Sequence, residues 1–255
     1  EENERKPYKV EITEVTDENG DGRIDLSDVE YLMRNKKNTM TLLEGDGDFR
    51  SPECVELLKE ADIVVTNPPF SLFRDYVALL MQYNKQFAII GNQNAITYRE
   101  IFPLIKSNKI WLGYNNGHYW FMVPDSYEEK KTDFKIDESG QKWRRMGNIC
   151  WFTNLDIEKR HEDMTLFRTY SPDIYPKYDN YDAIEVSKTA DIPCDYDGYM
   201  GVPITFMQYY NPEQFEIAGL DDHRVEWVGH GPRLNGKVKY RRVIIRRKQV
   251  NINEN

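Results

Sequence analysis

The sequence predicts an α/β protein with a mostly parallel, doubly wound sheet, followed by a β-rich and irregular region. Short apolar runs alternate with segments of helical periodicity up to about residue 115, which is the pattern of strands joined by helices. Beyond that point the chain is rich in aromatic residues, turns and mixed charge, as in β-hairpins. We therefore expect one region over residues 1–115 and a second over residues 116–255.

Local signals place the individual elements. A helix at 26–35 begins near Ser27 or Asp28, whose side chains can cap its first N–H groups. Pro52 falls in the first turn of the next helix, where a missing N–H is tolerated. In chain order we predict strand 7–12, helix 26–35, helix 51–61, strand 62–66, helix 72–84, strand 86–91, helix 97–108, strand 109–114, strand 212–220 and strand 240–247.

Composition narrows the class of protein. The 255 residues are 40% hydrophobic and 13% aromatic, which is enough for a real core in one large domain or two small ones. No apolar run approaches the ~20 residues of a membrane span, and nothing resembles a signal peptide. The three cysteines lie far apart without CxxC spacing, which indicates a reducing compartment and no zinc site. We therefore expect a cytoplasmic protein.

Charge is unevenly distributed along the chain. The net charge of −9 argues against a general polyanion binder. The run KVKYRRVIIRRK at 237–248 is nevertheless densely basic. Two interpretations remain open for it: a stripe that faces a phosphate backbone, with Arg246 and Arg247 as contacts, or a solvated edge strand protected by charge.

The strand at 62–66 runs directly into the tetrapeptide Asn67-Pro68-Pro69-Phe70. Prolines end a strand and keep the preceding residues extended, so this exit is stiff and carries an amide and an aromatic ring. Ligands of open α/β sheets bind at such carboxyl ends. An amide oxygen and a free carbonyl could accept hydrogen bonds from the amino group of a base, while the ring holds its plane. The alternative is an ordinary strand-ending turn.

A second candidate site is the glycine-punctuated stretch GDGDF, which contains Asp48 and Phe49. In a doubly wound sheet this stretch would lie at the tip of the preceding strand, and that tip would be adjacent to the tetrapeptide. The carboxylate of Asp48 could accept the adenine amino group of a nucleoside cofactor. A plain acidic turn is the alternative.

A third candidate is the polar loop at 17–28, DENGDGRIDLSD. Its spacing matches a calcium-binding loop, with aspartate in place of the usual final glutamate, and the ligands would be Asp17, Asn19, Asp21, the carbonyl of Arg23 and Asp28. The strand-like segment before the loop would make this a strand–loop–helix site with a structural role. A bare Asx-rich turn is the alternative.

Longer stretches resemble the EcoRI-type adenine-specific DNA methyltransferases. The resemblance covers nearly all of residues 42 to 217, and the block WRRMGNICWFTNLD is much more specific than NPPF alone. The stretches that carry it are GDGDFRSPECVELLKEADIVVTNPPFSLFRDYV, FAIIGNQNAITYREIFPLIKSNKIWLGY, GQKWRRMGNICWFTNLD, YPKYDNYDAIEV and IPCDYDGYMGVPITF.

The resemblance implies a Rossmann-like methyltransferase fold, S-adenosylmethionine as the methyl donor and a flipped-out adenine of duplex DNA as the substrate. It makes Asn67 to Phe70 the catalytic tetrapeptide and Asp48 the contact to the cofactor adenine, with Glu11 a candidate for the ribose hydroxyls. Such enzymes also hold the cofactor with a loop after their first strand. No such loop is found in residues 1–6, so we expect it upstream of the chain, with residues 17–28 as an insertion.

The second region would then recognise the DNA target, with Lys142, Arg144 and Arg145 as base or phosphate contacts. A monomer in a restriction–modification system, with a cognate endonuclease as partner, is the expected setting. Two rival functions are a methyltransferase of this fold that acts on RNA or a protein amide, and a non-catalytic DNA-binding module without the cofactor loop.

Overall fold

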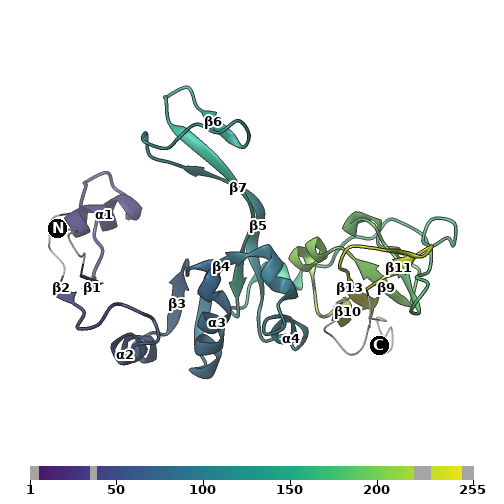
Figure 1. Cartoon of the computed structure of the whole chain (residues 1–255). Helices are drawn as coiled ribbons and strands as arrows, with labels where there is room; N and C mark the ends of the chain where they lie inside the picture. Colours follow the sequence, from purple (N-terminus) through teal and green to yellow (C-terminus); the bar gives the residue numbers. More distant parts are fainter. Residues whose placement is uncertain (1–5, 35–38, 221–230, 249–255) are drawn as a thin grey trace, which may run out of the picture. The chain divides into compact units, whose positions relative to one another are not determined.

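The computed structural model describes residues 6–34, 39–220 and 231–248 (Figure 1). The chain divides into two units, Glu1–Asp62 and Ile63–Asn255, each of which is described by itself. No helix in the described ranges is both long and apolar enough to cross a membrane.

The first unit contains a small antiparallel sheet and two helices. β1 (Tyr8–Glu11) pairs with β2 (Thr39–Leu42). The predicted helices are confirmed as α1 (Leu26–Arg34) and α2 (Pro52–Glu60). Ser51 caps α2, because its side chain accepts a hydrogen bond from the backbone N–H of Cys54.

The main sheet of the second unit has the order β3-β4-β7-β5, with the short strand β6 paired to β7. Its strands are β3 (Ile63–Thr66), β4 (Gln86–Asn92), β5 (Trp111–Met122), β6 (Phe134–Ile136) and β7 (Lys142–Thr153). β3 and β4 are parallel, while β7 runs antiparallel to both β4 and β5. β3, β4 and β5 therefore point the same way, with β7 inserted between β4 and β5 in the opposite direction.

The prediction of a mostly parallel sheet is wrong in its pairing, and the sheet is mixed. In the described sheet only β3 and β4 pair in parallel. The reason is that β5 continues far beyond its predicted end at residue 114 and returns as β7 without a crossover helix. Strands joined in this way must run antiparallel.

Helical segments connect the strands of this sheet and supply its core. η1 (Phe70–Leu72) and α3 (Phe73–Gln82) join β3 to β4, and α3 buries Phe73, Val77 and Leu80, which lie on one face of the helix. η2 (Gln93–Thr97) and α4 (Phe102–Lys106) join β4 to β5, so the helix predicted at 97–108 is shorter than expected. Pro103 stands in its first turn. The rings of Phe73 and Phe152 meet with centroids 4.9 Å apart.

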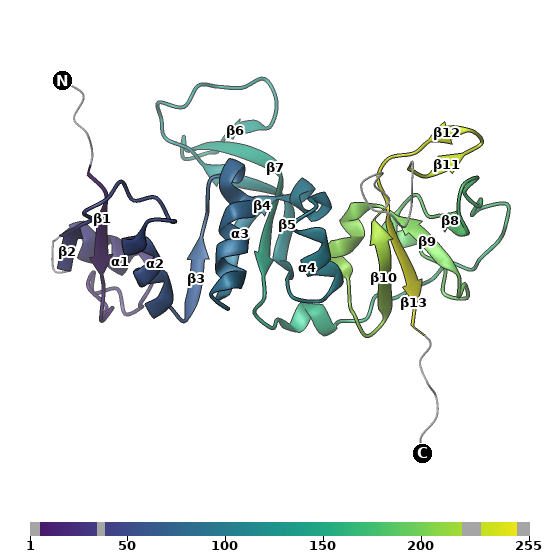
Figure 2. The same cartoon turned by 60° about the horizontal axis from the view of Figure 1, so that its bottom comes forward.

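A second sheet lies in the C-terminal part, with the order β10-β13-β9-β8 (Figure 2). Its strands are β8 (Ala183–Glu185), β9 (Tyr199–Val202), β10 (Phe215–Leu220) and β13 (Val243–Arg247), so both predicted late strands are confirmed. Smaller elements around it are η3 (Glu158–His161), η4 (Thr189–Asp191), η5 (Ile204–Tyr209), β11 (Arg233–Leu234) and β12 (Lys237–Val238). β13 lies between β10 and β9 with Val243, Ile244 and Ile245 all buried, so the interpretation of the basic run as an edge strand is wrong.

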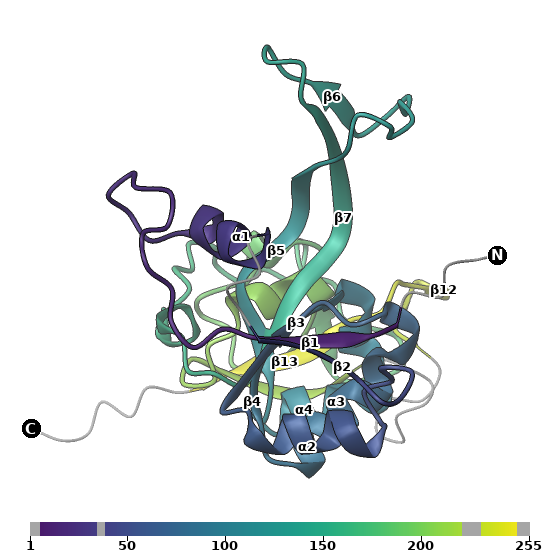
Figure 3. The ribbon, with the colours of Figure 1, turned by 90° about the vertical axis from the view of Figure 1, so that its left-hand side faces the viewer.

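The distal halves of β5 and β7 form an extension that we call the arm, residues 119–146. Tyr119–Met122 pair with Trp143–Met146, and β6 adds a third strand on the other side of β7. Figure 3 shows this ribbon leaving the rest of the second unit and carrying β6 near its end. The hairpin structure predicted beyond residue 115 is confirmed, at a greater length than the sequence indicated.

Gly91 of β4 offers a test of this packing. A Cβ atom there would lie 2.5 Å from Cε2 of Phe73 and 2.9 Å from Cε2 of Phe152, both in the buried core. We expect Gly91→Ala to lower the free energy of unfolding by about 1–3 kcal/mol, because overpacking forces rings out of their rotamers. Denaturant melting measures this change. Gly45→Ala is the control, since a Cβ at Gly45 meets nothing within 4 Å, and equal melting of the two variants would contradict the packing.

Candidate active site

The tetrapeptide lies at the carboxyl end of β3. Asn67 follows the last strand residue, Thr66, and Pro69 precedes η1, where its carbonyl accepts a hydrogen bond from the N–H of Leu72. Asn67 and Phe70 are exposed, and Pro68 is buried. Within the described part of the chain, neither the Asn67 amide nor the Pro68 carbonyl has a hydrogen-bond partner. The prolines thus leave two acceptors without a partner among the described residues at this edge of the sheet.

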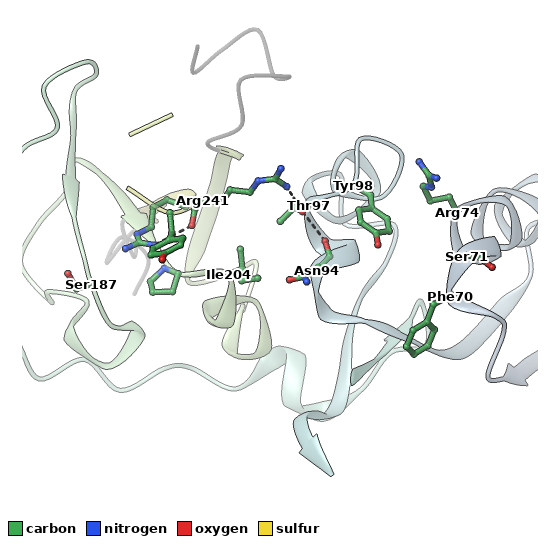
Figure 4. Close-up of a pocket in the computed structure, with 12 residues that line it drawn as sticks. Phe70, Ser71, Arg74, Asn94, Thr97, Tyr98, Ser187, Ile204 and Arg241 are labelled. Carbon is green, nitrogen blue, oxygen red and sulfur yellow. Dashed lines mark hydrogen bonds between the residues drawn. The ribbon is translucent and has the colours of Figure 1, made fainter. Parts of the chain in front are cut away.

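Phe70 lines a pocket of about 1020 Å³ (Figure 4). The pocket is formed where the carboxyl ends of β3 and β4 meet the C-terminal sheet region. Its other lining residues are Ser71, Arg74, Asn94, Thr97, Tyr98, Ser187, Pro203, Ile204, Tyr240, Arg241 and Arg242. A volume of this size is at the upper end of the range for small-molecule sites and exceeds the need of one nucleobase.

Three arginines and no carboxylate line this pocket. Arg74 lies over the ring of Tyr98, 5.7 Å from its centroid, and 3.9 Å from the carboxylate of Glu100. Arg241 donates a hydrogen bond of 2.7 Å to the hydroxyl of Thr97, which ties the C-terminal region to η2. The charged lining and the exposed ring of Phe70 together suit an anionic ligand that carries a flat base.

Arg242 is held beside the pocket by a buried carboxylate. Glu185 is 4% exposed, and Arg242 donates to it through Nε and Nη2 at 3.2 and 2.6 Å. The hydroxyl of Tyr178 donates to the other oxygen of Glu185. Burial alone would raise the pKa of Glu185, but the hydrogen bonds from Arg242 and Tyr178 hold it below its ordinary value. Arg242 is therefore a structural cation.

The two other arginines predicted in the basic run also have protein partners. Arg246 pairs with Glu216 at 2.7 Å and lies over the ring of Tyr199. Arg247 donates to the carbonyl of Cys194. Their contact with DNA stays a prediction, and a contact would have to compete with these partners.

The basic residues predicted in the second region organise the arm. Lys142 donates to the carbonyls of Asp125 and Tyr127, at 2.8 and 3.1 Å. Arg144 donates to the carbonyls of Thr132 and Asp133, and Arg145 pairs with the carboxylate of Asp133 at 3.0 Å. These three side chains hold the loop between β5 and β6 onto β7. Their contact with DNA also stays a prediction.

In the first unit, Asp48 forms a fork with Arg50, a residue that sequence reasoning missed. Nε and Nη2 of Arg50 lie 2.9 and 2.7 Å from the two carboxylate oxygens, and the Arg50 guanidinium lies over the ring of Phe49. The hydrogen bonds from the Arg50 side chain and backbone lower the pKa of Asp48 to about 2. Glu11 ends β1, exposed, 3.9 Å from the ammonium group of Lys9. The strand before Asp48, β2, pairs with β1 in its own sheet.

The calcium prediction for the loop at 17–28 is not supported. Across residues 6–34, 39–220 and 231–248, no group of three or more His, Cys, Asp or Glu side chains is arranged to hold a metal ion. The Asp17 carboxylate instead accepts the N–H groups of residues 20–22, and the buried Asp28 accepts those of Glu18, Asn19 and Asp25. Asn19 donates to Ser27, and Asp21 accepts the N–H of Arg23. The carboxylates close the loop on its own backbone, which is the Asx-rich turn.

Other pocket residues were missed although the sequence held a signal for some of them. Asn94, Thr97 and Tyr98 follow β4, so the rule that ligands bind at the carboxyl ends of strands could have indicated them. Beside the pocket, Glu185 is the charged residue within the apolar run AIEV at 183–186, and it needed a cation nearby once that run was taken as buried. Neither signal identifies the partner residue. Arg241 lies 144 residues after its partner Thr97, and Arg242 lies 57 residues after its partner Glu185.

The family model described as adenine-specific methyltransferase EcoRI matches residues 1–248. The chain is 51% identical over 214 residues to the Type II methyltransferase M.EcoRI of Escherichia coli, covering 81% of this chain and 64% of that protein. It is also 41% identical over 229 residues to the Type II methyltransferase M.MpnI of Mycoplasma pneumoniae, covering 81% of this chain and 70% of that protein. None of the solved structures matches the chain.

The fork between Asp48 and Arg50 predicts a titration. With the pKa of Asp48 at about 2, below its ordinary 3.8, the pair stabilises the fold above about pH 4, and this contribution is lost as the pH falls towards 2. We expect Arg50→Gln to return the pKa of Asp48 towards 3.8 and to remove the acid-dependent part of the stability. NMR titration of the Asp48 carboxyl carbon measures this pKa in the wild type and in the variant. An unchanged pKa in the variant would show that backbone hydrogen bonds, not Arg50, lower it.

Proposed function

The chain belongs to the family of EcoRI adenine-specific methyltransferases, and from this premise we propose that it methylates the exocyclic amino group of adenine in duplex DNA. The observation that carries the proposal is the tetrapeptide Asn67 to Phe70 at the carboxyl end of β3, whose two acceptors have no hydrogen-bond partner among the described residues and whose ring lines an arginine-rich pocket. The names of the relatives, Type II methyltransferases, support a role in restriction–modification.

The chemistry needs help because the lone pair of the amino nitrogen is delocalised into the base. The amide oxygen of Asn67 and the carbonyl oxygen of Pro68 accept hydrogen bonds from the two amino protons. Charge that develops on the amino group in the transition state is stabilised by these acceptors, which are fixed in place beforehand. Positioning then supplies most of the catalysis, and no side chain has to act as a strong base.

The adenine must leave the base stack, which costs a few kcal/mol. Stacking on the exposed ring of Phe70 returns about 1–3 kcal/mol of that cost. Arg74 and Arg241 both line the pocket, and their guanidinium groups can pair with phosphates beside the extruded nucleotide. The pocket volume of about 1020 Å³ leaves room for the nucleotide with its sugar and phosphate.

S-adenosylmethionine would supply an electrophilic methyl group on a sulfonium centre. Asp48, Phe49 and Glu11, the residues proposed to bind this cofactor, have side chains that suit its adenosine part. Asp48 is ionised at neutral pH, so it only accepts hydrogen bonds, as the adenine amino group requires, and the ring of Phe49 lies next to it in the chain. The exposed carboxylate of Glu11 can accept from ribose hydroxyls.

Replacement of Asn67 tests the catalytic assignment. We expect Asn67→Ala to lower the rate of methyl transfer about 10²–10³-fold, as for other single preorganised groups, while affinity for duplex DNA is retained. Asn67→Asp keeps an acceptor oxygen and should retain more activity than the alanine variant. Transfer of labelled methyl groups to duplex DNA by the full-length protein measures the rate. Near-normal turnover of Asn67→Ala would refute the assignment.

Replacement of Phe70 tests the stacking role. Phe70→Ala should weaken retention of the extruded base by about 1–3 kcal/mol, while Phe70→Trp should preserve it. A fluorescent base analogue at the target position reports extrusion by its loss of stacking. Phe167→Ala is the control, because Phe167 is 80% exposed and does not line this pocket. If Phe70→Ala gives the same signal as the wild type, Phe70 has no contact with the base.

A further inference from the structure

We infer that one face of the arm lies against the sugar–phosphate backbone of duplex DNA and positions it for the reaction. We call this the indole face, and its members are Trp120, Met122, Lys135 and Trp143. The inference rests on the proposed function, since it assumes a duplex substrate, and it assigns to the arm a contact independent of base sequence.

The arm starts at the sheet edge that carries the tetrapeptide. Thr66, the last residue of β3, pairs with Ile89 of β4, and Asn92 at the end of β4 pairs with Ile149 of β7. β7 then runs beyond this edge from Ile149 back to Trp143, a distance of about 20 Å at ~3.3 Å per residue. A duplex whose adenine reaches Phe70 therefore has the arm within its reach.

All three strands of the arm contribute to the indole face, β5 with two residues and β6 and β7 with one each. Met122 of β5, Trp143 of β7 and Lys135 of β6 form one cross-strand row. Trp120 lies two residues from Met122 and so shares its face. The ammonium group of Lys135 lies 4.8 Å from the ring centroid of Trp120 and 5.7 Å from that of Trp143, which agrees with this placement.

On the opposite face, the loop between β5 and β6 packs over part of the surface, and Phe121 stays 39% exposed. The row on this face contains Phe121, Arg144 and Phe134, and the ring of Tyr127 stacks on that of Phe134 at 6.5 Å. Arg144 holds the same loop through its hydrogen bonds to the carbonyls of residues 132 and 133. On the indole face, Trp120 is 38% and Met122 66% exposed. Exposed apolar area of this kind marks an interaction surface.

Charge distinguishes the partner. Lys142, Arg144 and Arg145 are engaged with the loop, whereas Lys135 has no carboxylate partner among the described residues. Its ammonium is fixed between two indoles and remains exposed, as an anion contact requires. A phosphate of DNA supplies that anion, and the indole rings can pack on the adjoining sugar. Phosphate contacts of this type position a duplex without reading its sequence.

The face is also held in one shape. Nε1 of Trp143 donates a hydrogen bond of 2.7 Å to Asp137, whose carboxylate also accepts from Ser139 and Gln141 in the turn before β7. Three paired strands with their side chains are wider than the two-stranded ribbon that the major groove admits. The arm therefore lies across the backbone instead of inserting into the groove.

The test measures affinity of the full-length protein for specific and random duplexes over a range of salt concentrations. Lys135→Gln should make the log–log salt slope shallower by about 0.9, the effect of one phosphate, on both duplexes alike. Trp120→Ala should lower affinity about five- to tenfold on both. The matched controls are Phe121→Ala, which is 39% exposed on the opposite face, and Lys131→Gln in the exposed loop, and both should bind as the wild type does.

Three outcomes would overturn the inference. Wild-type affinity and salt slope in both Trp120→Ala and Lys135→Gln would do so, while binding and methylation by the wild type would leave the proposed function intact. Loss of affinity for the specific duplex alone would mean that the face reads bases. Unchanged DNA binding together with altered sedimentation would make the face an interface between copies of the chain. Circular dichroism melting verifies that each variant is folded.

Discussion

The antiparallel ladder between β4 and β7 is the constraint on which the rest of the second unit depends. It joins Ala88–Asn92 to Ile149–Thr153 and places β7 between two strands that run the other way. Side chains close the ladder at its base, where the hydroxyl of Thr153 donates to the carbonyl of Phe87 and the amide of Asn154 bonds both Phe87 and Lys85. The side chains of Phe87, Ile89 and Phe152 in this ladder are fully buried. Because backbone groups in such a position must be paired, the register has no freedom to slip.

Two features of the site follow from this ladder. The carboxyl ends of β3 and β4 lie at the same edge of the sheet, and both the tetrapeptide and η2 contribute residues to the pocket. The continuation of β7 beyond β4 becomes the arm, so the edge that carries the tetrapeptide and the arm are parts of one sheet. The C-terminal part of the chain completes the pocket, because Arg241 donates a hydrogen bond to Thr97 of η2. In a second contact, Lys106 of α4 donates to the carbonyl of Ala218 in β10.

The charged and polar groups of the described residues divide into those with partners in the protein and those without. Most of the basic run at 237–248 belongs to the first kind, because β13 is a central strand whose arginines must satisfy Glu185, Glu216 and the Cys194 carbonyl. Asn67 and Lys135 belong to the second kind within the described residues. In a family that acts on a polyanion, groups of the second kind are the better candidates for substrate contacts, since binding breaks no internal pair.

The sequence by itself determined the class of the protein, most of the strands and helices before residue 92, and the tetrapeptide, because these depend on local periodicity, proline geometry and a contiguous motif. It did not determine the insertion of β7, the central place of β13 or the partners of its arginines. Those depend on contacts between residues far apart in the chain, such as Arg242 with Glu185 and Asn92 with Ile149. The calcium-like spacing is not supported for a related reason, since the sequence does not show that the oxygens of Asp17 and Asp28 accept hydrogen bonds from the backbone of their own loop. A pattern in the sequence names the groups that are present, whereas the tertiary structure decides which of them are already occupied.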